Sequence, residues 1–290
     1  MAMAAREREL LASLFAADHL GQMIKGEPTP LLLTAAKLVS RSLPTNRPIT
    51  STDILDAAYQ LLVAELPVEY VFKACALERL LFGRHSPRTT AFYTEFRIGD
   101  SRADFLVVNG HAVVYEIKTR YDDLARLDAQ LTDYYRAFSH VTVFVDPLQI
   151  KAVTNSVPEH VGISVLSRRS SISVVRKPTS FRESLRPEAL FRLLREPEYT
   201  AILHGRGFQL GSVDPAYRYV YARDAFCTLP LGAVYPEVLA ALKRRQDTAR
   251  LADISATLPT SLRIAPFAHR MPREDWRTLS KVLNCQLAIT

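Results

Sequence analysis

Between residues 91 and 146, the alternation of hydrophobic and polar positions predicts three strands, one helix and a fourth strand, in that order. The strands are expected over residues 91–98, 103–108, 111–118 and 141–145, with residues 120–123 leading into a helix that ends near 138. Because a helix separates the third strand from the fourth, these two should run parallel through a right-handed crossover. Both faces of the second and third strands are apolar, which favours a sheet covered on both sides.

Helical spacing of apolar residues dominates the chain on both sides of this unit. Helices are expected over residues 4–24, 31–43, 50–62, 67–82, 187–194, 197–203, 212–221 and 236–251. Two short apolar segments, 161–166 and 172–175, are typical of edge strands. The pattern therefore predicts an α/β protein with a mixed four- to five-stranded sheet flanked by helices. Its three parts are a helical N-terminal region, the core and a mostly helical, basic C-terminal region, over residues 1–85, 86–180 and 181–290.

The hairpin between the second and third strands decides whether two acidic side chains share one face of the sheet. Asn109 and Gly110 form the strongest hairpin signal in the chain. With a plain two-residue loop, Asp104 lies opposite Tyr115, and Glu116 projects from the other face. A three-residue loop that ends at a left-handed Gly110, or a bulge near Asp104, puts both carboxylates on one face. We expect one of these two features.

Composition and charge narrow the class of protein. The chain has 290 residues, of which 48% are hydrophobic and 23% charged, as in ordinary globular proteins. Its formal net charge of +7 is compatible with a polyanionic partner such as nucleic acid. Cys75, Cys227 and Cys285 have neither disulfide-framework nor zinc-ligand spacing, which fits a reducing compartment. No apolar run reaches membrane-spanning length and the N-terminus is charged, so we expect a cytoplasmic protein with no membrane partner.

Charged residues inside otherwise apolar strands indicate a functional site. Asp104 interrupts the second strand, and Glu116 and Lys118 interrupt the third. The carboxylates of Asp104 and Glu116, with the backbone carbonyl of Ile117, are the hard oxygen ligands that Mg²⁺ or Mn²⁺ prefers. A lysine beside them can orient water or counter charge in the transition state of phosphodiester hydrolysis. The structural alternative is a buried ion-pair cluster, which is disfavoured because two neighbouring acids repel each other without a cation.

The residues Ala103-Asp104 and Glu116-Ile117-Lys118, within a helix-strand-strand-strand-helix-strand order, resemble the motif of the PD-(D/E)xK nuclease superfamily. Ala103 stands where the motif has its proline. The resemblance implies a restriction-endonuclease-like core in which Asp104, Glu116 and Ile117 bind the metal. It implies that Lys118 positions the nucleophile.

Many members of that superfamily place an additional acid upstream, and this chain has two candidates for it. Glu95 on the first strand is favoured as a further metal ligand, because that strand adjoins the hairpin. Glu78 on the preceding helix is the alternative. Gln130 and Tyr134, one helical turn apart, look like the Q-x-x-x-Y motif of RecB-type members. The resemblance implies that they hold the site or the nucleic-acid strand, and ordinary helix packing is the alternative.

A narrower resemblance, to an uncharacterised bacterial family of nuclease-like proteins, rests on the segments 69–71, 83–86 and 116–118. This likeness covers roughly residues 50–220. It implies cleavage of DNA with Mg²⁺ or Mn²⁺, either in defence against foreign DNA or in DNA processing. The choice between DNA and RNA stays open, as does the presence of a homodimer or of a protein partner from a defence operon.

Two other functions are compatible with the sequence. One is a non-cleaving nucleic-acid-binding or regulatory protein on the same fold, and the other is a nuclease subunit that is active only with a partner. Basic residues near the expected site are candidates for nucleic-acid contacts, namely Arg84, His85, Arg102, Arg120 and Arg126. The alternative for Arg84 and His85 is a helix C-terminus whose cations suit the dipole, and for Arg120 and Arg126 a solvated surface.

Overall fold

The computed structural model describes residues 3–64, 69–84, 86–166 and 172–287, without the side chains of residues 69–72 and 84. The chain forms two compact units, each discontinuous in sequence. Unit 1 comprises Met1–Arg88, Leu166–Ile172 and Thr248–Thr290, and unit 2 comprises Thr89–Val165 and Ser173–Asp247. The predicted C-terminal region is therefore divided between the units after Asp247. Within the described ranges, no helix is long and apolar enough to cross a membrane.

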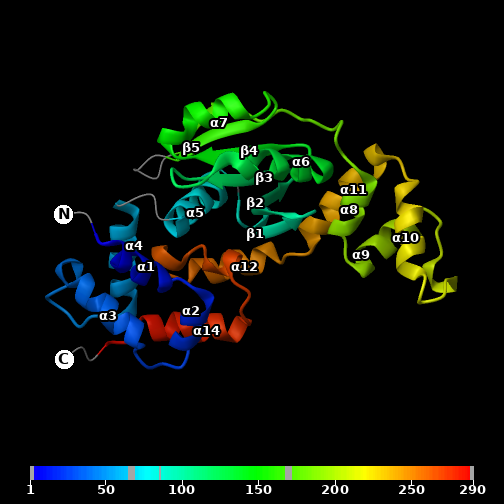
Figure 1. The fold of residues 1–290 in the computed structure, drawn as a ribbon. Coiled ribbons are helices and arrows are strands. Elements are labelled where there is room, and N and C mark those ends of the chain that lie inside the picture. Colours follow the sequence, from blue (N-terminus) through cyan, green and yellow to red (C-terminus); the bar gives the residue numbers. More distant parts are fainter. Residues whose placement is uncertain (1–2, 65–68, 85, 167–171, 288–290) are drawn as a thin grey trace. The chain divides into compact units, whose positions relative to one another are not determined.

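Unit 2 is built around a six-stranded mixed sheet whose strands lie side by side in chain order (Figure 1). The strands are β1 Ala91–Ile98, β2 Ser101–Asn109, β3 His111–Lys118, β4 Val141–Val145, β5 Gly162–Leu166 and β6 Ile172–Arg176. The first three strands are antiparallel, whereas β4 runs parallel to both β3 and β5. The parallel pairing of β3 with β4 confirms the prediction. The prediction that β5 is an edge strand was wrong, because β6 takes that position and leaves β5 fully buried.

The β2–β3 hairpin turns at Gly110, whose φ of 75° lies in the left-handed region that glycine tolerates. The two strands pair on both sides of this glycine, and their ladder ends where Phe105 lies opposite Tyr115. One residue further along each strand, Asp104 faces Glu116. The predicted three-residue loop was wrong, because Asn109 pairs with His111 and leaves Gly110 alone in the turn. The turn has the predicted left-handed Gly110, and it puts both acids on one face of the sheet.

Side-chain alternation in β1 reverses at Glu95. Its φ of 51° is the one positive value for a non-glycine residue in the described part of the chain. Tyr93 and Phe96, on either side of it, both belong to the same core, and their ring centroids are 5.1 Å apart. Strict alternation along β1 would place Phe96 on the face of Phe92, but alternation requires extended backbone at every residue, and Glu95 is not extended. A left-handed glutamate costs about 1–3 kcal/mol, and such strain clusters at functional sites.

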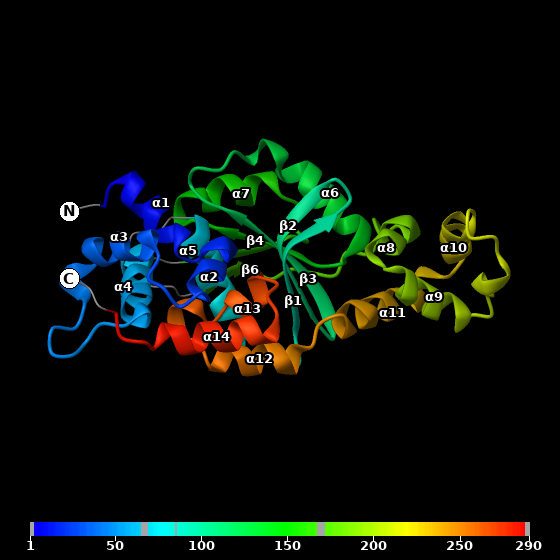
Figure 2. The same ribbon diagram turned by 90° about the horizontal axis from the view of Figure 1, so that it is seen from below.

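The helix α6, Leu127–Ala137, packs on one face of the sheet, as predicted. A short 3-10 turn, η3 Leu124–Arg126, precedes it, and the Asp123 carboxylate caps that turn. Figure 2 shows α6 on the same side of the sheet as α7, Ile150–Ser156, which follows the short η4, Pro147–Gln149. Because α6 connects β3 to β4, it holds its side chains over the strand that carries Glu116.

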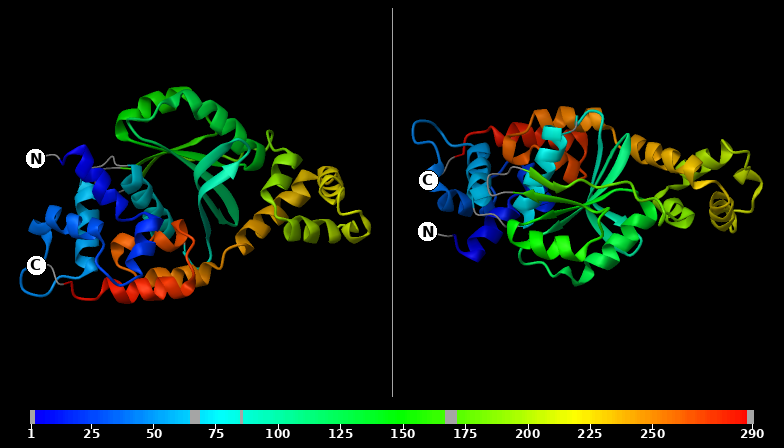
Figure 3. Two further views of the ribbon diagram at one scale, coloured as in Figure 1. Left: turned by 60° about the horizontal axis from the view of Figure 1, so that its bottom comes forward. Right: turned by 90° about the horizontal axis from the view of Figure 1, so that it is seen from above.

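Four further helices of unit 2 gather beyond the sheet (Figure 3). They are α8 Pro187–Leu193, α9 Glu196–His204, α10 Arg218–Cys227 and α11 Leu231–Arg244, with the short η5 Leu210–Ser212 between α9 and α10. The predicted helix start at Pro236 was wrong, because α11 begins five residues earlier and contains this proline. Burial of Val238 and Leu242 on the same helix offsets the single hydrogen bond that Pro236 cannot make.

Unit 1 is mostly helical in its described residues. Its helices are α1 Ala5–Ser13, α2 Ala17–Met23, α3 Pro30–Leu38, η1 Ser40–Ser42, α4 Ser51–Ala64, α5 Glu69–Glu78, η2 Arg79–Arg84, α12 Thr248–Ala256, η6 Thr260–Leu262, α13 Ala265–Ala268 and α14 Arg273–Leu283. The single helix predicted over 4–24 is divided into α1 and α2. The buried His19 ring bonds the Leu14 carbonyl at 2.8 Å, which satisfies a backbone group that an unbroken helix would have paired.

Candidate active site

Five of the side chains singled out in the sequence meet where β2 and β3 separate. Asp104 comes from β2, Glu116 and Lys118 from β3, and Gln130 and Tyr134 from α6. Glu116 and Lys118 share a face because strand side chains alternate with a period of two. Gln130 and Tyr134 are four residues apart and therefore project from one side of α6. The crossover thus brings the strand motif and the helix motif together.

The Glu116 carboxylate is the centre of this cluster, and the residue is only 4% exposed. Its Oε1 accepts hydrogen bonds from Lys118 Nζ at 3.0 Å and from Gln130 Nε2 at 2.7 Å. Its Oε2 accepts a hydrogen bond from the Tyr134 hydroxyl at 2.6 Å. An ionised carboxylate offers about four acceptor positions, so these three donors leave room for one more ligand.

Asp104 lies across the hairpin from Glu116 and is partly accessible to solvent. Its Oδ2 accepts a hydrogen bond from the Ile117 backbone N–H at 2.7 Å. In an antiparallel ladder a residue directs its N–H and its C=O to the same neighbouring strand, so the Ile117 carbonyl also faces β2. The Asp104 carboxylate and the Ile117 carbonyl are therefore both directed toward the gap between the strands.

Lys118 is held between two partners on the same face. Its ammonium lies 3.0 Å from Glu116 Oε1 and donates to Gln130 Oε1 at 2.9 Å. The Gln130 amide thus donates to the carboxylate through its nitrogen and accepts from the lysine through its oxygen. This arrangement fixes the side chain of a residue that is only 7% exposed.

Burial and the charge of Asp104 raise the pKa of Glu116 above its ordinary value of 4.5, although Lys118 and Tyr134 act in the opposite direction. Burial and the Glu116 charge also raise the pKa of Tyr134, so its hydroxyl stays protonated and can donate. The repulsion between the two acids thus persists although the Lys118 ammonium lies beside Glu116.

We expect this repulsion to appear as a pH dependence of stability in the metal-free protein. A raised folded-state pKa stabilises the protein below the ordinary value, and this contribution is lost as the pH rises through the raised pKa. As the pH rises above 4.5, the free energy of unfolding of wild type should therefore fall relative to that of Glu116→Gln. Urea unfolding of both proteins at several pH values measures the difference. A difference that stays constant with pH would contradict the shift.

Tyr134→Phe is expected to destabilise the protein by about 1.5–3 kcal/mol, because the buried Glu116 carboxylate loses a charge-assisted hydrogen bond. Urea unfolding measures the change, and Tyr121→Phe is the control because Tyr121 is 77% exposed. Equal effects of the two substitutions would show that the Tyr134 hydroxyl contributes nothing to the site.

The two candidates for the additional acid lie in different surroundings. Glu95 is opposite Asp104 in the β1–β2 register, but its carboxylate is turned to Arg102, with Oε2 2.8 Å from Arg102 Nε. Glu78 belongs to unit 1, where the Tyr59 hydroxyl donates to it at 3.5 Å. Only Glu95 therefore lies in the same unit as Asp104, and its role as a ligand stays a prediction.

The predicted nucleic-acid contacts have different positions. Arg102 pairs with Glu95, and Arg126 is exposed at the start of α6. Arg120 bonds one oxygen of Asp146, through Nε at 3.0 Å and through Nη2 at 2.8 Å. The Arg84 side chain and all of His85 lie outside the described residues.

Sequence reasoning missed Asp146. This residue is 2% exposed, and its backbone N–H donates to the Lys118 carbonyl at 3.0 Å. Its carboxylate also accepts from the Leu148 N–H at 2.9 Å, which caps η4. An aspartate between a buried strand and Pro147 is a helix-start signal that could have indicated it. Asp146 anchors Arg120 near the end of β3, beside the candidate site.

The described residues contain no group of three or more His, Cys, Asp and Glu side chains arranged to hold a metal ion. The donor set at the hairpin is smaller, with Asp104, Glu116 and the carbonyl of Ile117. It fits Mg²⁺ or Mn²⁺, because such ions use one or two carboxylates and fill their other positions with water or substrate oxygens.

Comparison with known proteins finds a curated relative and a solved structure that are similar to parts of this chain. Protein cII of Enterobacteria phage P4 is 37% identical over 62 residues, which are 21% of this chain and 24% of that protein. The chain thus matches about a quarter of the length of this curated relative. A solved protein of unknown function from Silicibacter pomeroyi aligns with 40% of this chain and 77% of its own, at a TM-score of 0.29 and 18% identity.

The family model described as bacteriophage P4 protein cII matches residues 63–249, which is well over half of the chain. The matched segment contains the candidate site from Asp104 to Tyr134. The chain therefore belongs to the bacteriophage P4 protein cII family.

Proposed function

We propose that this protein is a divalent-metal-dependent nuclease that hydrolyses phosphodiester bonds of DNA. One observation carries the proposal: the buried Glu116 carboxylate is held by Lys118, Gln130 and Tyr134 and lies across the hairpin from Asp104. Buried ion pairs seldom add net stability, and titratable groups with a perturbed pKa are characteristic of functional sites. The combination of two acids and one lysine suits phosphodiester hydrolysis.

Membership of the PD-(D/E)xK superfamily, with a restriction-endonuclease-like core, is part of this proposal. It is supported by the antiparallel β1–β2–β3 segment followed by α6 and by β4 parallel to β3. Asp104 on the second of these strands and the Glu116–Lys118 triplet on the third occupy the motif positions. Gln130 and Tyr134 bond the motif glutamate from the next helix.

The residues of the site have separate tasks in this mechanism. Asp104, Glu116 and the Ile117 carbonyl would hold Mg²⁺ or Mn²⁺, which when bound supplies Lewis-acid stabilisation of the phosphate charge. The Lys118 ammonium orients the attacking water and opposes the negative charge that develops on the phosphate. Gln130 fixes the position of Lys118, and Tyr134 fixes the Glu116 carboxylate through the other oxygen.

The substrate is proposed to be a DNA strand that contacts basic side chains around this site. Arg126 is exposed at the start of α6, and Arg120 is oriented by Asp146 at the end of β3. Guanidinium groups match the geometry of phosphate oxygens, and the net charge of +7 favours association with a polyanion. A biological role in defence or in DNA processing is compatible with this activity.

Cleavage is expected to require added metal. Purified full-length protein should cut supercoiled plasmid, or linear single- or double-stranded DNA, in Mg²⁺ or Mn²⁺, and EDTA should abolish the reaction because the acids then lack their cation. Gel analysis of the products separates endonuclease from exonuclease action. The same assay with an RNA of the same sequence shows whether the protein cleaves DNA, RNA or both.

Three outcomes would contradict this proposal in whole or in part. Cleavage that persists in EDTA would exclude a metal-dependent reaction. Binding of DNA without cleavage in either metal would favour the non-cleaving regulatory protein. Cleavage that appears only after a co-purifying protein is added would favour the partner-dependent subunit instead.

A further inference from the structure

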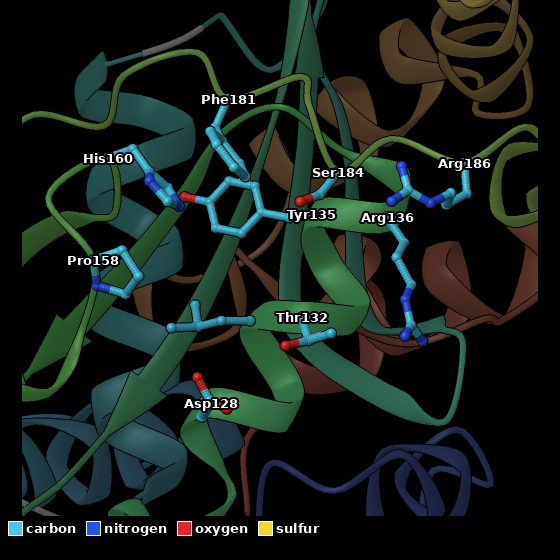
Figure 4. A pocket seen from close by; sticks show the side chains of 10 residues that line it. Asp128, Thr132, Tyr135, Arg136, Pro158, His160, Phe181, Ser184 and Arg186 are labelled. Atoms are coloured by element: carbon cyan, nitrogen blue, oxygen red, sulfur yellow. The ribbon is translucent and has the colours of Figure 1, made fainter.

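Unit 2 contains a cavity whose α6 residues lie on a different face of that helix from Gln130 and Tyr134. Figure 4 shows side chains that line this cavity. The cavity lies between α6 and the two segments that precede β5 and α8, and its volume is about 300 Å³. This size is at the lower end of the range for small-molecule sites, which combine apolar walls with a few convergent polar groups. The mechanism proposed above does not use this cavity.

The Tyr135 hydroxyl in the cavity is buried and unpaired. Tyr135 is 4% exposed, and its hydroxyl has no hydrogen-bond partner among the described residues. Burial raises the pKa of this hydroxyl, and its interactions with the Val141 backbone and with Arg176 act in the opposite direction. Buried hydroxyls are normally paired because an unpaired one costs stability. A ligand that enters the cavity and displaces the groups packed over this hydroxyl would supply the partner.

The charged side chains of the cavity are separated by sign. Figure 4 shows Asp128 at one end and Arg136 and Arg186 at the other, with Ser184 beside the arginines. Asp133 orients Arg136 at 3.3 Å, and backbone carbonyls orient Arg186 at 3.0 and 3.2 Å. Each guanidinium has five N–H donors, so these bonds leave others for a ligand. The cavity therefore suits a molecule with an anion at one end and N–H donors at the other.

Between these ends the cavity is aromatic and uncharged. The rings of His160 and Phe181 stack with centroids 4.0 Å apart, and Tyr135 meets His160 edge-on at 4.7 Å. Burial and the charge of Arg176 lower the pKa of His160, so its ring is neutral near pH 7 and offers one donor and one acceptor. Such walls accept a planar polar ring.

We propose that this cavity binds a phosphate monoester joined to a planar base, with the phosphate at Arg136 and Arg186 and the base toward Asp128. Two guanidinium groups match a doubly charged phosphate, whereas the Asp128 carboxylate repels it and accepts the N–H groups of the base. A free nucleoside 5′-monophosphate and the 5′-phosphorylated end of a strand share this chemistry. The proposal does not depend on cleavage by the Glu116 site.

Isothermal titration calorimetry of the full chain tests the proposal. The ligands are AMP, CMP, adenosine, inorganic phosphate, and a tetranucleotide with or without its 5′-phosphate. EDTA in the buffer keeps metal away from Glu116 and prevents cleavage. We expect saturable binding of a monophosphate, at least tenfold tighter than that of adenosine or of inorganic phosphate. Binding of the phosphorylated tetranucleotide as well would identify the strand end as a source of the ligand.

Matched variants assign this binding to the cavity. Arg186→Ala should weaken binding at least tenfold, whereas Arg192→Ala, at an exposed arginine of α8, should leave it unchanged. Tyr135→Phe should weaken binding at least threefold without lowering the melting temperature, because it removes an unpaired hydroxyl. Absence of monophosphate binding, equal affinity for inorganic phosphate, or wild-type affinity in both folded variants would overturn the proposal.

Discussion

Glu116→Gln is expected to lower DNA cleavage at least about 10³-fold, since the amide offers the metal one neutral oxygen in place of a carboxylate. Each tenfold change in rate corresponds to about 1.4 kcal/mol of activation free energy. The expected factor therefore corresponds to the loss of several kcal/mol of charge stabilisation in the transition state. Asp104→Asn removes the other carboxylate and should have a similar effect. Single-turnover cleavage of plasmid DNA at saturating Mg²⁺ or Mn²⁺ measures both.

The control for these two substitutions is Glu159→Gln, at an exposed glutamate in the same unit. It should retain wild-type cleavage. DNA binding in EDTA should survive in all three proteins, because the change affects chemistry and not the basic surface. Cleavage by Glu116→Gln within tenfold of wild type would remove this carboxylate from the mechanism.

Lys118→Met is expected to lower the cleavage rate about 10²–10³-fold, the range found when one donor that stabilises developing charge is removed. The methionine preserves the length and apolar stem of the lysine but has no ammonium. Breaking the buried pair also leaves Glu116 without its cation, so the metal-free variant should lose about 3–5 kcal/mol of stability. Added metal should recover part of this loss because it binds only the folded state.

Two measurements separate chemistry from folding in this variant. Cleavage is measured at a temperature where circular dichroism shows Lys118→Met to be folded, and Lys151→Met is the control at an exposed lysine of α7. A variant that is folded, binds DNA and cleaves at the wild-type rate would show that Lys118 only neutralises Glu116. A loss confined to cleavage would place the ammonium at the reacting phosphate.

Local patterns were sufficient for most of the core of unit 2. The β2–β3 hairpin is predictable because Asn109 and Gly110 act through neighbouring backbone, and a left-handed glycine needs no distant partner. The parallel pairing of β4 follows from chain connectivity, since a helix between two strands leaves few other arrangements. The register of the hairpin then decides whether the side chains of Asp104 and Glu116 lie on the same face of the sheet.

Other features had no local signal. Glu95 lies in a sequence that alternates like an ordinary strand, yet its left-handed backbone reverses the faces of β1, which depends on packing against β2 and the core. Pro236 suggested a helix start, but burial of α11 outweighed this preference. The division of the chain into two discontinuous units brings together segments that share no sequence pattern.

The sequence by itself determined the strand and helix order of the core, the hairpin and the identity of the acidic and basic residues, because these depend on side-chain periodicity and backbone preference within a few residues. The tertiary structure alone decided that Gln130 and Tyr134 bond the Glu116 carboxylate, that Arg120 pairs with Asp146 and that Tyr135 lines a separate cavity. The three contacts join residues 14, 18 and 26 positions apart in the sequence. They depend on how α6 crosses the sheet, which short-range patterns do not specify.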